Sequence, residues 1–97
     1  MADEVMIGEW SKVSPPTPEV QAMLDSVKDK AEDKAGLNFD VYKVKTYSVQ
    51  VVTGKKNYRV KVDVGDDEFI HVRMFEDDGG KVTLRSVQIN KTVDDVF

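Results

Sequence analysis

The sequence predicts an α+β fold in which an antiparallel sheet of about four to five strands wraps around one helix. In the first third of the chain, apolar residues recur every three or four positions, which is the period of a helix with one buried face. After Asn38 the spacing changes to two, as in half-buried strands. With 97 residues, 40% of them hydrophobic, the chain has the size of a single domain with one core.

The segment ahead of the helix contains no long element. Trp10 and Val13 are apolar and predict at most a short edge strand. The prolines of "PPTP" (residues 15–18) lack an amide hydrogen, so they end strand pairing at that point. We therefore expect residues 1–8 to form a flexible trunk, followed by a short pairing segment and a stiff connector.

The helix is expected to cover residues 18–35. Thr17 can cap the free amides of its first turn, and Pro18 has the backbone angle of a first helical position. Gly36 follows the last turn and ends the helix. The side chains expected to face the sheet are Val20, Met23, Leu24, Val27 and Ala31.

Residues 41–52 predict a long strand whose buried face changes partway along. Tyr42 and Val44 share one face, whereas Tyr47, Val49 and Val51 share the other. A β-bulge near residues 45–46 is the simplest explanation, because one extra residue exchanges the two faces and bends the strand.

Three further strands are expected after this one. Residues 58–64 and 70–74 alternate between apolar and polar side chains, and a last strand covers about residues 82–90. The connecting sequences "GDDE" (residues 65–68) and "DDGG" (residues 77–80) have the composition of loops.

The composition argues against several classes of function. The chain has 18 acidic and 14 basic residues, and its formal net charge of −4 disfavours nucleic acid as a partner. It has no cysteine, which removes disulfides and thiolate ligands, and no metal-ligand spacing or cofactor motif is present. No apolar run approaches the ~20 residues of a membrane helix, and no secretory signal is recognisable. We therefore expect a cytoplasmic protein with no cofactor, metal or membrane contact.

An enzyme is not expected either. No serine is paired with a base in a known motif, and the sequence offers no thiol nucleophile. The single histidine, His71, lies on the face of its strand opposite Ile70 and Val72, where we expect it to be solvated. The sequence therefore predicts no catalytic residues.

Two apolar groups have no obvious place in the core. In "QVVTG" (residues 50–54), Val51 and Val52 stand beside a turn, where polar residues are normal. Apolar side chains that stay exposed until a partner covers them are typical of binding sites. For these two valines the alternative explanation is packing at the end of a strand. The second group is Val5, Met6 and Ile7, ahead of Gly8, and for it the alternative explanation is an unstructured tail.

Several motifs, in a fixed order, resemble one known family. "QVVTG" is similar to a Gln-Val-Val-Ala-Gly hairpin, with Thr53 in place of alanine, and Gly8 lies at the expected distance before it. "MIG", "PPTPEVQ", "NYRVKVDVGDDEFIHVRMF" and "VQINK" extend the likeness over nearly the whole chain. The family is the stefins, the disulfide-free branch of the cystatins.

The resemblance implies a single cystatin-like domain over residues 1–97 that inhibits papain-like cysteine proteases, such as cathepsins, by tight and reversible binding. The trunk and two hairpins would form a wedge that plugs the protease cleft. A non-inhibitory protein-binding module on the same fold is the alternative. The protease-binding residues that the resemblance implies are Val5, Met6, Ile7, Gly8, Gln50, Val51, Val52, Thr53, Gly54, Asp78 and Gly79.

The chain departs from the stefin pattern in three places. Glu9 adds a charge where many stefins have a small residue. Lys55 resembles an insertion that is expected to widen the first hairpin turn or move its tip, and so to ease its strain. We therefore expect a monomer, with the domain-swapped dimer that stefins can form as the alternative. The second hairpin, "EDDGG", is short and acidic and lacks the usual Leu-Pro, so Asp78 and Gly79 are expected to make a weak third contact.

Overall fold

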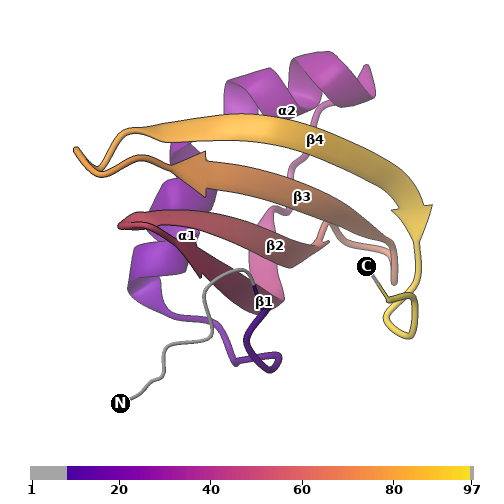
Figure 1. Cartoon of the computed structure of the whole chain (residues 1–97). Coiled ribbons are helices and arrows are strands. Elements are labelled where there is room, and N and C mark those ends of the chain that lie inside the picture. The colour runs from indigo at the N-terminus through magenta and orange to yellow at the C-terminus, as the bar shows by residue number, and fades with distance from the viewer. Residues whose placement is uncertain (1–8, 97) are drawn as a thin grey trace.

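The computed structural model describes residues 9–96 of the chain. It contains one antiparallel sheet of four strands in the order β1-β2-β3-β4, with the helices on one side (Figure 1). Each strand pairs with its neighbour in the chain, so three hairpins build the sheet. The predicted α+β class is confirmed. The strands are β1 (Lys43–Val52), β2 (Lys55–Asp63), β3 (Phe69–Glu76) and β4 (Val82–Lys91).

The helical region consists of two segments where the sequence predicts one. Helix α1 covers Pro18–Ser26 and helix α2 covers Lys28–Ala35. Between them Val27 has φ −111° and ψ 11°, outside helical values. The hydroxyl of Ser26 donates to the carbonyl oxygen three residues earlier at 2.6 Å, a local bond that competes with regular helix geometry. Val27 is nevertheless buried, so the apolar stripe continues across the break.

Both ends of the helical region lie where the sequence predicts. The Thr17 hydroxyl accepts a hydrogen bond from the Val20 amide at 3.2 Å. At the other end Gly36 has φ 70°, a left-handed conformation that glycine adopts without strain. Within residues 9–96 neither helix has the length and apolar character that crossing a bilayer requires.

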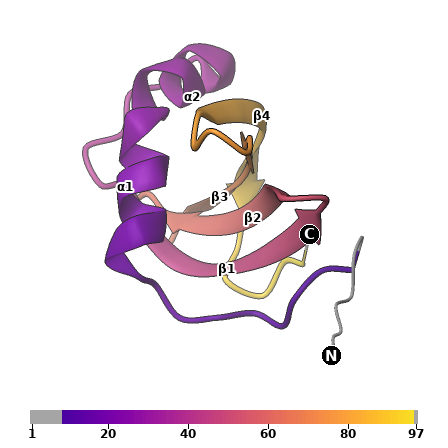
Figure 2. The ribbon, with the colours of Figure 1, turned by 60° about the vertical axis from the view of Figure 1, so that its left-hand side comes forward.

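The core lies between the helices and the inner face of the sheet, which curves beneath them (Figure 2). The two period-two patterns are confirmed, because their apolar members all point to this face. No solvent reaches Val60, Val62 or Val72. The helices and the two central strands contribute Val20, Leu24, Val27, Ala31, Tyr58, Val60, Val62, Ile70, Val72 and Met74.

The β-bulge predicted in the first strand is confirmed. Val44 pairs with Val62, and Thr46 pairs with Lys61, the next residue along β2, so Lys45 is the extra residue. Beyond the bulge the odd-numbered Tyr47 packs against the core. The bulge therefore lets one long strand keep its apolar side chains inward while it bends.

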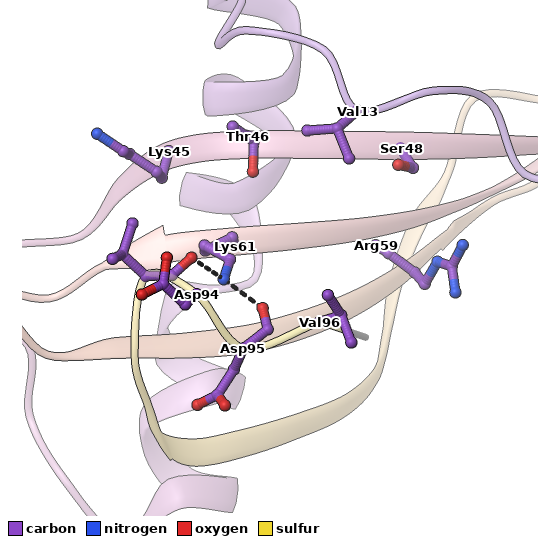
Figure 3. A pocket seen from close by; sticks show the side chains of 10 residues that line it. Val13, Lys45, Thr46, Ser48, Arg59, Lys61, Asp94, Asp95 and Val96 are labelled. Atoms are coloured by element: carbon purple, nitrogen blue, oxygen red, sulfur yellow. Dashed lines mark hydrogen bonds between the residues drawn. The ribbon is translucent and has the colours of Figure 1, made fainter.

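The prediction that His71 is solvated is wrong, because the outer face of the sheet is covered at this point. His71 is only 1% exposed. Next to it in the sheet, Lys61 donates from Nζ to three backbone carbonyl oxygens of residues 92–95, at 2.5 to 3.1 Å. The bond to Asp95 is drawn in Figure 3. The segment that follows β4 is thereby fastened over the outer face.

Candidate functional site

The first hairpin ends in a tight two-residue turn. Val52 pairs with Lys55, and Thr53 and Gly54 form the turn with φ values of 49° and 80°. Two successive positive φ values are the requirement of a type I′ turn, whose twist matches that of paired strands. The turn is thus not widened, because Lys55 begins β2 as a paired residue.

The two valines of this hairpin are accessible from outside. Val51 is 38% exposed, Val52 is partly exposed, and neither belongs to the core. Behind them the Asn57 side chain donates to Oε1 of Gln50 at 3.0 Å and ties the two strands together. The hairpin therefore presents apolar side chains on a support whose shape is already fixed.

The second hairpin connects β3 and β4 at the same end of the sheet as the first (Figure 1). Its turn is organised by the Asp77 carboxylate, which accepts from the amides of Gly79 and Lys81 at 2.9 Å each. Asp78 and Gly79 are exposed at the tip. This hairpin is ordered and acidic and offers no apolar side chain at its tip.

The chain ahead of the helices runs beside β1 toward the first hairpin (Figure 2). Two isolated bridges join Trp10 to Gln50 and Ser14 to Tyr47, so the short edge pairing that the sequence predicts is present in reduced form. Trp10 thus stands opposite the residue that precedes the two valines. The remaining predicted site residues, Val5, Met6, Ile7 and Gly8, lie outside the described residues.

The structure brings three segments to one end of the sheet: residues 9–10, 50–54 and 77–80 (Figure 1). Sequence reasoning missed one feature there. The Trp10 ring lies on the guanidinium groups of Arg59 and Arg73. Only the strand register, which places these two arginines opposite each other, could have indicated it.

The described part of the chain holds no constellation for metal chemistry. Among residues 9–96 no group of three or more His, Asp or Glu side chains could hold an ion. A cavity of about 500 Å³ on the outer face is lined by Val13, Arg59, Lys61 and Val96, among others (Figure 3). None of the hairpin residues 50–54 lines it.

Comparison with known proteins identifies the family. The family model described as a cystatin domain matches residues 8–94. Cystatin-B of Bos taurus is 41% identical over 90 residues, which cover 90% of this chain and 91% of the relative. Cystatin-B of Homo sapiens is 37% identical over 94 residues (94% and 95%), and Stefin-C of Bos taurus is 40% identical over 88 residues (88% and 86%). The chain therefore belongs to the cystatin family, in its stefin branch.

Proposed function

We propose that this cystatin inhibits papain-like cysteine proteases, the cathepsins among them, by inserting its trunk and its first hairpin into the active-site cleft. The observation that carries the proposal is the tight turn at Thr53 and Gly54, which holds Val51 exposed and Val52 partly exposed. Apolar side chains on a rigid loop lose little conformational entropy when a groove covers them. The hairpin is therefore suited to fill a preformed cleft without rearranging.

The trunk supplies the second part of the wedge in this proposal. Val5, Met6 and Ile7 have the character of pocket-filling residues on the substrate side of the cleft. Gly8 lacks a Cβ, so the chain can pass close to the catalytic cysteine and turn away without presenting a peptide bond to it. The bridge between Trp10 and Gln50 supports this arrangement, since it starts the trunk beside the hairpin.

Of the three segments of the wedge, the second hairpin contributes least to protease binding. Asp78 is exposed and charged, and burying a carboxylate against a protease surface costs free energy unless a cation pairs with it. The third contact is therefore weak, and affinity depends on the other two segments.

Titration of papain with the full chain tests the proposal. Full-length protein should inhibit reversibly at about one molecule per active site, and deletion of residues 1–8 should raise the inhibition constant at least about tenfold, or about 1.4 kcal/mol. Equal inhibition constants for the two proteins would mean that the trunk does not take part in protease binding. Failure of the full chain to inhibit papain would favour a non-inhibitory binding module instead.

We propose that the protein is a monomer. Exchange of strands between two copies would open the first hairpin and release the strain of the β-branched Thr53 at φ 49°, about 1–2 kcal/mol. Association of two chains costs more than that, roughly 4–15 kcal/mol. Size-exclusion chromatography should therefore give one peak at 10.9 kDa, before and after mild heating. A stable dimer peak after heating would contradict the proposal.

We also propose a cytoplasmic location for the inhibitor. Its similarity to stefins supports this location, and the sequence contains no cysteine that an oxidising compartment would pair.

A further inference from the structure

We infer that Trp10 is a positioning residue that fixes where the amino-terminal trunk leaves the sheet. The inference rests on the proposed function, because it assumes that the trunk binds the protease. Trp10 need not touch the protease in this role. It acts by holding the start of the trunk beside the first hairpin.

The indole is held by two strands other than the one its backbone pairs with. Cζ of Arg59, on β2, lies 3.9 Å from the centroid of the Trp10 ring, and Cζ of Arg73, on β3, lies 5.4 Å from it. Both distances fall within the range of about 6 Å in which a cation is attracted to an aromatic face. Because the Trp10 backbone bridges to Gln50 on β1, this one residue is fastened to three of the four strands.

The two arginines make the position occupied by the Trp10 ring specific for an aromatic side chain. Arg59 and Arg73 are direct cross-strand partners, an arrangement in which like charges repel. Burial lowers the pKa of Arg59, and the charge of Arg73 lowers it further. The electron-rich face of the Trp10 ring attracts both cations and so offsets their repulsion.

Backbone hydrogen bonds fix the next residue in the same place. The Ser11 amide donates to the carbonyl oxygen of Val49 at 2.8 Å, and the Ser11 hydroxyl accepts from the Val49 amide at 3.0 Å. The trunk therefore starts from an anchored point, because Ser11 is bonded to Val49, two residues along β1 from Val51. An anchored start restricts the conformations of a short trunk before binding, and this lowers the entropy lost when the protease takes it up.

A comparison of two backgrounds tests the inference on papain. In the full chain, Trp10→Ala should raise the inhibition constant about tenfold, while Trp10→Phe, which keeps an aromatic face, should stay within about threefold. In a background with Val5, Met6 and Ile7 each replaced by serine, Trp10→Ala should have an effect of less than about twofold, because no apolar trunk is left to position. An equal effect in both backgrounds would overturn the inference.

The same comparison separates this inference from the proposed function. If the triple serine background alone inhibits as well as the full chain, the proposed role of the trunk fails.

The contact of the Trp10 ring with the two arginines can then be tested without a protease, because Trp10 is the only tryptophan of the chain. Combined Arg59→Gln and Arg73→Gln should increase acrylamide quenching of its fluorescence about twofold, since the ring is freed. Arg85→Gln, which removes a cation from the ring of Phe75 instead, is the matched control and should leave quenching unchanged. Unchanged quenching in the double variant would overturn the inference.

Discussion

Replacing Val51 by aspartate is expected to raise the inhibition constant for papain at least about tenfold, or about 1.4 kcal/mol. Val51 is 38% exposed, so the substitution leaves the core intact. In the complex, however, an aspartate at this position must give up its water inside a cleft that fits an apolar side chain. Burying an unpaired carboxylate is far more costly than burying a valine. The loss should therefore appear in binding and not in the free energy of unfolding.

Val41 provides a matched control for this substitution. It is 37% exposed and lies two residues before β1, at the opposite end of that strand from the first hairpin. Val41→Asp should change the inhibition constant by less than about twofold, and Asp78→Ser, on the second hairpin, by less than about threefold. Similar losses for Val51→Asp and Val41→Asp would argue against a binding surface at the hairpin. Urea unfolding of each variant checks that stability is preserved.

Much of the fold was predictable because local spacing reports which side chains face the core. The alternation in β2 and β3 holds for this reason, since Val60, Val62 and Val72 belong to the same core as the buried side chains of the helices. The bulge at Lys45 was predictable too, because the buried face changes from even to odd positions. The hairpin tip was singled out by a different observation, since Val51 and Val52 stand beside a turn, where polar residues are normal.

The rest depends on contacts between residues far apart in the sequence. His71 has the spacing of a solvent-facing residue, and nothing near it indicates that residues 92–95 fold back to bind Lys61 on the adjacent strand. The break at Val27 was hidden for another reason. Val27 keeps its place in the apolar stripe. The hydrogen bond of the Ser26 hydroxyl competes with regular helix geometry but does not change the spacing of the apolar residues.

The burial of His71 predicts that the protein loses stability as the pH falls from about 6.5 to about 4. Burial, followed by the charges of Lys61 and Lys91, lowers the pKa of His71 from 6.5 to about 4, while the Asp95 carboxylate partly opposes them. Arg59 and Arg73 line the same small pocket on the outer face and add positive charge around the ring. In the native state His71 is therefore neutral over most of this interval and binds a proton only near its lower end.

The sign follows from the proton balance between the two states. Below pH 6.5 the histidine of the unfolded chain binds a proton, whereas the native histidine does so only near pH 4, so protons favour unfolding between these values. At about 1.4 kcal/mol per pH unit, the upper limit of the loss is about 3.5 kcal/mol. The stabilisation is fully present above pH 6.5 and is lost as the pH falls through this interval.

Urea unfolding at pH 7.0, 5.5 and 4.5 measures this loss, with His71→Gln as the control that cannot titrate. Between about pH 7 and 4.5 the unfolding free energy of the original protein should fall by about 2 kcal/mol more than that of the variant. The carboxylates titrate in both proteins, so their contribution cancels in the difference. Parallel pH profiles would mean that His71 does not govern the acid sensitivity of the fold. A profile that diverges as predicted would identify His71, on the covered outer face of the sheet, as a group whose protonation destabilises the fold.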